Sequence, residues 1–147
     1  MKRLTAVLVA SLFVHVSLAL SADGWSDNYQ EALALAKKEN KPVLINFTGS
    51  DWCGWCIKLK KDVFSTQEFQ DFAKNNVVLF EADFPQGKKL PQAVKEQNEQ
   101  LQTEFKVDGY PTLVLVNAEG KELDRNVGYL KGGPEAMIAW IKASQKK

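Results

Sequence analysis

The sequence has few of the residues from which metal sites and disulfide scaffolds are built. Its 147 residues include two cysteines and one histidine. Two cysteines are too few for the framework of a small disulfide-rich domain or for a four-cysteine zinc site. The formal net charge of +1 gives no basis for broad electrostatic capture of nucleic acid, so no nucleic-acid partner is expected. The hydrophobic and charged fractions, 45% and 25%, are those of one globular domain rather than of a disordered or fibrous chain.

The beginning of the chain has the layout of a secretory signal peptide. Lys2 and Arg3 give it a positive start, residues 4–20 are almost continuously apolar, and small residues follow. An uncleaved membrane anchor is the alternative, because about 17 apolar residues are close to the shortest span of a bilayer. We predict a cleaved signal peptide at 1–22, a single domain at 23–147 and a periplasmic or secreted protein. Contact with a membrane is expected only if the signal segment stays uncleaved.

Cleavage would change the inventory of reactive groups. The histidine, His15, lies in the signal segment, so the mature domain would have none and could build no Cys–His pair, Ser–His–Asp triad or histidine metal site. Without Lys2 and Arg3, 17 basic residues face 18 acidic ones, and the net charge becomes −1. Export would also place Cys53 and Cys56 in an oxidising compartment. We expect no metal and no organic cofactor.

Apolar runs alternate with helical patterns through the rest of the chain. Short apolar runs predict strands at 43–47, 77–82 and 112–116, and a turn at 117–120 predicts a hairpin into a strand at 121–126. Helical spacing predicts helices at 27–40, 53–63, 66–74 and 88–106, and a last one that begins at Pro134. Ser26 is the expected N-cap of the first helix, and Ser65 with Glu68 matches a capping box before the third. This order predicts an α/β fold, with a central mixed sheet flanked by helices on both faces.

The two cysteines lie in Trp52-Cys53-Gly54-Trp55-Cys56, where a predicted strand and loop lead into a helix. A separation of three residues brings both sulfur atoms within reach of a disulfide. At the start of a helix, unpaired N–H groups and the positive end of the dipole favour a thiolate, so Cys53 is the expected attacking residue. Cys56, one turn later, is the expected resolving thiol and should be more buried. Gly54 permits a close turn, and Trp55 would shield part of the disulfide.

Other roles for this pair are less consistent with its spacing. An inert structural disulfide is one alternative, but such bridges usually close longer loops, because a short loop restrains the unfolded chain less. Zinc binding or copper transport would need more ligands, and the mature domain would have no histidine and no third cysteine. The spacing and the start of a helix therefore favour a redox-active pair.

Three segments of the chain resemble the thioredoxin superfamily. They are Val43-Leu44-Ile45-Asn46-Phe47, Trp52-Cys53-Gly54-Trp55-Cys56 and Gly109-Tyr110-Pro111-Thr112-Leu113. The stretch from Phe47 to Cys53 more narrowly resembles exported bacterial thioredoxin-like proteins. The resemblance extends from about Pro42 to Ser144 and implies a thioredoxin fold.

The resemblance also implies roles for the residues around Pro111. In the family the proline loop lies beside the cysteine helix, so we expect a cis Tyr110–Pro111 bond, with an ordinary trans turn as the alternative. Backbone groups of Tyr110 would then be free to pair with an extended substrate strand. Trp52 and Trp55, with Tyr110 and Gly54, would form an apolar docking surface around the disulfide. For Trp52, packing over the cysteine helix is the alternative.

Two features depart from thioredoxin. Asn46 stands where thioredoxin carries a buried aspartate that is thought to relay the proton of the resolving cysteine. Because an asparagine cannot accept a proton at neutral pH, the relay would use water, Glu81 or Asp83, and Asn46 could instead be a hydrogen-bonded core amide. The second departure is residues 88–106, whose helix before the cis-proline loop would be longer than in thioredoxin. That helix could present a solvated face or a wall specific for a partner.

These features predict a thiol–disulfide oxidoreductase that reduces or isomerises protein disulfides. Cys53 would attack a substrate disulfide, and Cys56 would resolve the mixed disulfide. A dithiol oxidase is less favoured, because no histidine near Cys53 would over-stabilise its thiolate. A non-catalytic module that binds clients is the other alternative. The expected partners are protein thiols and disulfides and, for a reductase, an electron donor embedded in the membrane.

Overall fold

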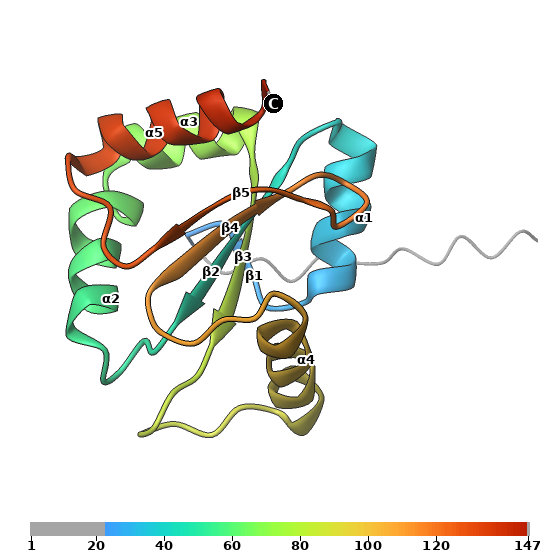
Figure 1. The fold of residues 1–147 in the computed structure, drawn as a ribbon, viewed down its shortest axis with the longest axis vertical. Coiled ribbons are helices and arrows are strands. Elements are labelled where there is room, and N and C mark those ends of the chain that lie inside the picture. Colours follow the sequence, from blue (N-terminus) through green and yellow to red (C-terminus); the bar gives the residue numbers. More distant parts are fainter. Residues whose placement is uncertain (1–22, 147) are drawn as a thin grey trace, which may run out of the picture.

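A five-stranded sheet lies between two groups of helices in the computed structural model, which describes residues 23–146 (Figure 1). The strands are β1 (Trp25–Ser26), β2 (Val43–Thr48), β3 (Val78–Asp83), β4 (Thr112–Val116) and β5 (Glu122–Val127). The helices are α1 (Tyr29–Glu39), α2 (Gly54–Leu59), α3 (Gln67–Asn76), α4 (Gln92–Glu104), α5 (Gly133–Ser144) and η1 (Lys60–Phe64), a π-helical turn that continues α2. The predicted signal peptide, residues 1–22, lies outside the described residues. Within 23–146, no helix has both the length and the apolar character needed to cross a bilayer.

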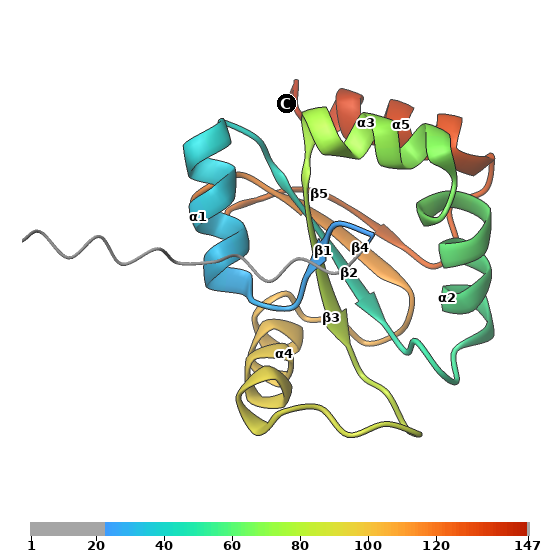
Figure 2. The ribbon, with the colours of Figure 1, turned by 180° about the vertical axis from the view of Figure 1, so that it is seen from behind.

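The strands lie in the order β1-β3-β2-β4-β5. β1 and β2 run parallel to β3, whereas β4 runs antiparallel to both β2 and β5. Helices cover both faces of this mixed sheet, α1 and α4 on one and α2, α3 and α5 on the other (Figure 2). The α/β fold class predicted from the order of patterns is confirmed.

The two faces of β2 explain why most of its residues are apolar. Successive side chains of a strand point to opposite faces, and a strand covered on both faces needs apolar residues at nearly every position. Val43, Ile45 and Phe47 join the core beneath α1 and α4, whereas Leu44 joins the core beneath α2, α3 and α5. Asn46 has the parity of Leu44, so it faces the layer that contains the cysteine helix.

Two helices begin later than predicted. The first begins at Tyr29 with Asn28 as its N-cap, because Ser26 is held in β1, where it pairs with Phe80 of β3. The third begins at Gln67, and the side chain of Thr66 rather than that of Ser65 caps it. In both cases the residue that caps the helix lies one or two positions after the predicted one.

The helix before the proline loop is shorter than predicted. It covers Gln92–Glu104 instead of 88–106, and residues 84–91 form a loop. Pro91 disfavours helical geometry at the residue before it, so the helix cannot extend back to residue 88. At the other end, Lys106 has a φ of 52°, which is incompatible with a continued right-handed helix. The position of this helix is as predicted, and its length is not.

Thr66→Ala should lower the free energy of unfolding by about 1 kcal/mol, because the Phe69 amide would lose the acceptor that caps α3. Ser65→Ala is the matched control and should change stability by less than about 0.5 kcal/mol. Urea unfolding of the two oxidised variants measures both effects. A greater loss for Ser65→Ala would show that the capping register predicted from the sequence is the correct one.

Candidate active site

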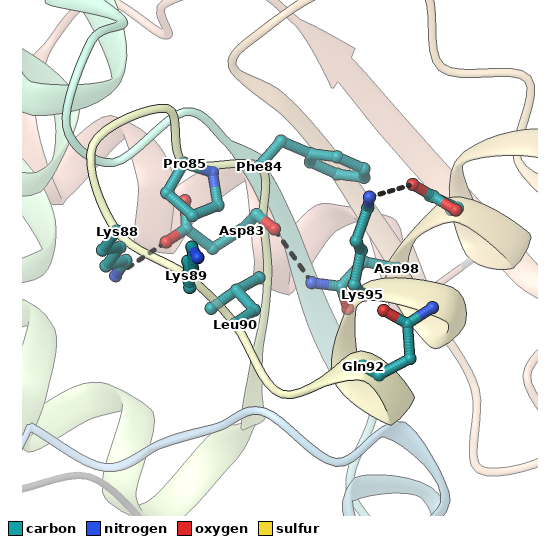
Figure 3. A pocket seen from close by; sticks show the side chains of 10 residues that line it. Asp83, Phe84, Pro85, Lys88, Lys89, Leu90, Gln92, Lys95 and Asn98 are labelled. Atoms are coloured by element: carbon teal, nitrogen blue, oxygen red, sulfur yellow. Dashed lines mark hydrogen bonds and ion pairs between the residues drawn. The ribbon is translucent and has the colours of Figure 1, made fainter.

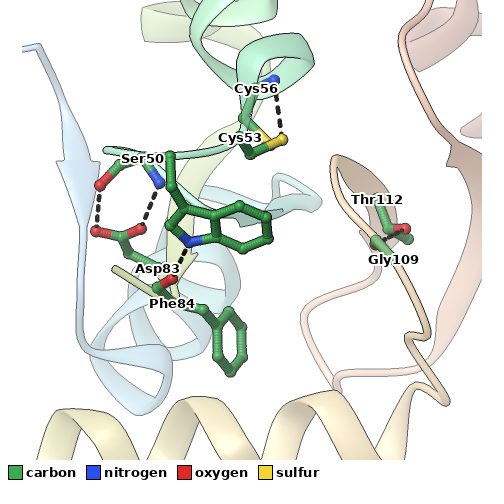
Figure 4. Close-up of a disulfide and its surroundings, with 8 residues drawn as sticks. Ser50, Cys53, Cys56, Asp83, Phe84, Gly109 and Thr112 are labelled. Carbon is green, nitrogen blue, oxygen red and sulfur yellow. Dashed lines mark hydrogen bonds between the residues drawn. A yellow bond between two sulfur atoms is a disulfide. The ribbon is translucent and has the colours of Figure 1, made fainter. Parts of the chain in front are cut away.

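The cysteine pair forms a disulfide at the first turn of α2. β2 ends at Thr48, and a turn at 49–52, here called the cysteine turn, leads to Cys53, whose N–H donates to the Gly49 carbonyl at 2.9 Å. Cys53 is the N-cap residue of α2, and its Sγ accepts a hydrogen bond from the Cys56 N–H at 3.2 Å (Figure 4). The end of a buried strand thus fixes where the helix begins. It also fixes which sulfur atom accepts a hydrogen bond from an N–H group of the first turn.

This geometry supplies what disulfide exchange requires. After reduction, the amide that bonds Cys53 Sγ would stabilise a thiolate on that atom, which is the attacking species in exchange. Cys56 lies one turn further and is held beside it, with 5.2 Å between the two Cα atoms. In the oxidised protein the two residues are exposed to a similar extent, 7% for Cys53 and 5% for Cys56, so the expected difference in burial is small.

The proline loop, residues 109–111, lies beside the cysteine turn. The Tyr110–Pro111 peptide bond is cis, as expected from the resemblance. Thr112 anchors the loop, because its hydroxyl donates to the Gly109 carbonyl at 2.8 Å and its backbone begins β4 next to β2 (Figure 4). Gln102 of α4 holds the other side of the loop, since its Nε2 donates to the Tyr110 hydroxyl at 2.8 Å. The helix before the loop thereby positions Tyr110.

Aromatic rings join the cysteine turn to the proline loop. Trp52 meets Tyr110 edge to face at 5.9 Å between ring centroids, and Tyr110 stacks on Phe84 at 5.2 Å. The Trp52 indole N–H donates to the Phe84 carbonyl at 2.7 Å. We call Trp52, Tyr110 and Phe84 the first aromatic group. Trp52 is 43% exposed, so the group is anchored by its polar edge while part of its apolar surface faces solvent.

Trp55 does not join this group, although the sequence placed it on one docking surface with Trp52. Its ring contacts Tyr129, with 5.4 Å between centroids. Trp55 and Tyr129 are here called the second aromatic group. Sequence reasoning identified neither Tyr129 nor Phe84, and no local pattern marks them, because each acquires its position from a contact with a distant segment.

Two carboxylates connect the cysteine turn to the end of β3 and the loop that follows. Asp83 accepts hydrogen bonds from the Ser50 N–H at 2.9 Å and the Ser50 hydroxyl at 2.6 Å. Asp51 accepts from the backbone N–H groups of Gln86 at 2.9 Å and Gly87 at 2.6 Å. Asp51 is exposed, and these bonds lower the pKa of its carboxyl. The cysteine turn is therefore held from two directions.

The 84–91 loop also borders a hollow of about 430 Å³ beside α4 (Figure 3). Asn98, which is buried on α4, donates from Nδ2 to the Asp83 carbonyl oxygen at 3.0 Å. Lys88 pairs with the Asp83 carboxylate at 2.8 Å. The charged groups lining the hollow thus contribute to holding the loop that supports the site.

Three polar residues on β2 and β3 bear on the predicted proton relay, and the structure distinguishes between them. Asn46 is buried directly opposite Glu81 in the β2–β3 register, and its Oδ1 receives no hydrogen bond from residues 23–146. Burial raises the pKa of Glu81, an effect that nearby Lys60 opposes. The Asp83 carboxylate is already engaged by Ser50 and Lys88. Asn46 is therefore buried as expected but is not a fully hydrogen-bonded amide.

No group of three or more potential metal-binding side chains occurs in the part of the chain that the structure describes. The polar groups near the disulfide are engaged in holding loops or lie on the sheet beneath α2. The site is thus a disulfide flanked by aromatic rings and a proline loop.

Comparison with known proteins agrees with this architecture. Residues 29–145 match the family model for the thioredoxin-like domain. The chain belongs to the thioredoxin-like family. This thioredoxin-like chain is 40% identical over 120 residues to the disulfide bond reductase DsbH of Chlamydia pneumoniae, an alignment that covers 82% of the chain and 72% of DsbH. It is 33% identical over 101 residues to the thioredoxin-related protein DsbJ of the same organism, covering 69% of the chain but 29% of DsbJ.

A solved structure extends this thioredoxin-like similarity to three dimensions. The structure of DsbH oxidoreductase matches with a TM-score of 0.79 at 37% sequence identity, covering 95% of each chain. The family resemblance inferred from the cysteine and proline segments is confirmed. Cys53 and Cys56 therefore form a redox-type cysteine pair in a thioredoxin-like fold.

Asp51→Ala should release the 84–91 loop from the cysteine turn. The amide protons of Gln86 and Gly87 should then exchange with solvent at least about tenfold faster, measured by NMR. In the unmodified protein the same bonds should persist above pH 3.8, the ordinary pKa of Asp51, and be lost as the pH falls through its lowered folded-state value.

Asp27→Ala removes an exposed carboxylate outside the site and is the matched control, which should leave the exchange of Gln86 and Gly87 unchanged. Equal exchange rates in Asp51→Ala and the unmodified protein would contradict a restraining role for the Asp51 carboxylate.

Proposed function

We propose that this protein is an exported disulfide reductase that acts on protein substrates. It is a thiol–disulfide oxidoreductase of the thioredoxin-like family, and the observation that carries this conclusion is the Cys53–Cys56 disulfide at the first turn of α2, beside the proline loop. The exported location rests on the signal-peptide pattern of residues 1–22.

In the proposed reaction, the reduced protein transfers two electrons to a substrate disulfide. The Cys53 thiolate attacks one substrate sulfur, and the other substrate sulfur leaves as a thiolate that takes up a proton. The Cys56 thiol then loses its proton, and its sulfur attacks Cys53 Sγ. This second step releases the remaining substrate sulfur as a thiolate and leaves the Cys53–Cys56 disulfide. The electron transfer uses only the two cysteine sulfur atoms, so we propose that no metal or organic cofactor takes part.

Two considerations support net reduction, and a third supports a polypeptide substrate. The relative DsbH is named a disulfide bond reductase. Residues 23–147 contain no histidine that could over-stabilise the Cys53 thiolate. Trp52 and Trp55 present exposed apolar surface on either side of Cys53 in the sequence, which suits a polypeptide substrate. A reductase must be reduced again after each cycle, and for an exported protein we propose a membrane-embedded thiol donor.

Cys53→Ser should abolish reduction of insulin disulfides, because the attacking sulfur is lost. Cys56→Ser should instead accumulate a covalent mixed disulfide through Cys53, visible by mass spectrometry of the intact protein after incubation with an oxidised client. Equal insulin reduction by Cys53→Ser and the unmodified protein would leave a non-catalytic client-binding module as the better description. Equilibration with glutathione distinguishes a reductase from a dithiol oxidase, since a reductase pair requires the lower potential.

We further propose that Glu81 accepts the proton of Cys56 during resolution, through water. Its burial and its place opposite Asn46, on the face of the sheet covered by α2, support this role. The unpartnered Asn46 Oδ1 supports a water molecule at this place, because a buried acceptor without a donor is costly. Asp83 is the less suitable acceptor, since its carboxylate already binds Ser50 and Lys88.

Glu81→Gln should slow resolution of the mixed disulfide by about 100-fold at neutral pH, the smaller end of what acid–base catalysis contributes. In the unmodified protein, titration of Glu81 should make the rate of resolution depend on pH. In Glu81→Gln this dependence should be absent. Stopped-flow tryptophan fluorescence between pH 5 and 9 measures both, with Glu68→Gln as an exposed-carboxylate control. Identical pH–rate profiles for Glu81→Gln and the control would exclude this role.

The free energies of unfolding of the unmodified protein and of Glu81→Gln provide a separate measure of Glu81 burial. A raised folded-state pKa means that folding favours the protonated form, so the stability contributed by Glu81 should fall as the pH rises from 4.5, its ordinary value, through the raised one. Glu81→Gln should remove this decline in urea unfolding experiments.

A further inference from the structure

The second aromatic group connects the cysteine helix to the segment between β5 and α5. Trp55, between the two cysteines, is 58% exposed and lies against Tyr129. The residue before Tyr129, Gly128, donates its N–H to the Pro111 carbonyl at 2.8 Å. The segment that carries Tyr129 is therefore bonded directly to the proline loop. Trp55 and Tyr129 thus border the same site as the first aromatic group, Trp55 from α2 and Tyr129 from the segment between β5 and α5.

Polar contacts hold the Tyr129 ring in place. The Tyr129 hydroxyl donates to Asp62 Oδ2 at 2.8 Å, and Lys58 Nζ donates to the same oxygen at 2.6 Å. Lys58 Nζ also lies 5.5 Å from the centroid of the Tyr129 ring, within the range of a cation–π contact. The two hydrogen bonds lower the pKa of Asp62. Tyr129 is thereby fixed at its hydroxyl and at its face, while Trp55 packs against the ring.

The charges of Lys58 and Asp62 offset each other. Lys58 is the cation nearest the Tyr129 ring among the contacts described, and its ammonium is paired with Asp62. The surface therefore gains no net charge from Lys58 and Asp62. What it offers is the exposed part of the Trp55 indole, whose burial against an apolar group is favourable.

We propose that Tyr129, held by Asp62 and Lys58, is a positioning residue that fixes Trp55 as an aromatic wall and so selects substrates with a large apolar side chain beside the reacting cysteine. The occupant is a disulfide-bearing polypeptide segment. The proposal rests on the proposed reductase function and adds the substrate class. A substrate side chain that reaches Trp55 is bound before the sulfur atoms exchange, so selection should act on binding more than on the maximal rate.

Two synthetic peptides provide the test. They differ only in carrying Phe or Ser next to a cysteine that is held in a mixed disulfide with a fluorescence quencher. The unmodified protein, in its reduced form, should act on the Phe peptide with a kcat/KM about tenfold higher, and the difference should lie mainly in KM. Trp55→Ala and Tyr129→Ala should reduce this preference to less than about twofold, whereas Trp55→Phe, which keeps an aromatic wall, should retain it.

A matched pair of lysines separates positioning from general stability. Lys58 and Lys142 both lie over aromatic rings, at 5.5 Å from Tyr129 and 5.4 Å from Phe72 respectively. Lys58→Ala should weaken the preference for the Phe peptide, and Lys142→Ala should leave it unchanged. Thermal unfolding of each variant confirms that the comparison is made between folded proteins, and Trp55→Ala, which alters an exposed side chain, serves if Tyr129→Ala does not fold.

The outcomes distinguish this proposal from the function on which it rests. If the unmodified protein reduces neither peptide, the reductase function is wrong. If it reduces both with equal kcat/KM, the reductase function stands and the selection by Trp55 and Tyr129 is wrong. A variant Tyr129→Ala that folds and slows both peptides by the same factor would also overturn the proposal, because the residue would then affect reactivity and not selection.

Discussion

The first turn of α2 is the constraint on which the site depends. Cys53 must follow a buried strand closely enough for its amide to bond Gly49, and it must begin the helix so that its sulfur receives the Cys56 N–H. These two hydrogen bonds fix the position of Cys53 Sγ, the sulfur that would attack. They hold it where the first turn of the helix provides an N–H donor that no backbone carbonyl accepts. Cys56 is then placed by helical geometry alone, one turn along the same rigid element.

The surroundings of this turn are held by contacts that differ in kind. Carboxylates secure the backbone, since Asp51 and Asp83 bind the 84–91 loop and Ser50 respectively. Aromatic rings secure the side chains, with Trp52 directed toward the proline loop and Trp55 toward Tyr129. Polar anchoring of partly exposed rings lets the molecule display apolar surface near the disulfide without losing the positions of the rings.

The sheet beneath α2 contains polar groups whose burial costs stability. Asn46 and Glu81 are polar residues within the mostly apolar strands β2 and β3, and both face the layer of the cysteine helix. Burying an acceptor without a donor and a carboxyl with a raised pKa both cost stability. A sequence that packed this layer with aliphatic side chains would avoid that cost, which supports a role for the two residues in proton movement during the reaction.

The fold class, the reactive pair, and the order of the helices and of strands β2 to β5 could all be predicted from the sequence, whereas β1 could not. These follow from short-range regularities, namely apolar runs, helical spacing and two cysteines three residues apart at a predicted helix start. The tertiary structure decided the N-caps at Asn28 and Thr66, the shortened helix at 92–104, and the partners of Asp51 and Trp55. Tyr129 and Asp62 are 67 residues apart in the chain, and no periodicity relates them. Only the packing of the β5–α5 segment against the cysteine helix brings them together, because contacts between distant segments depend on the whole fold and not on local pattern.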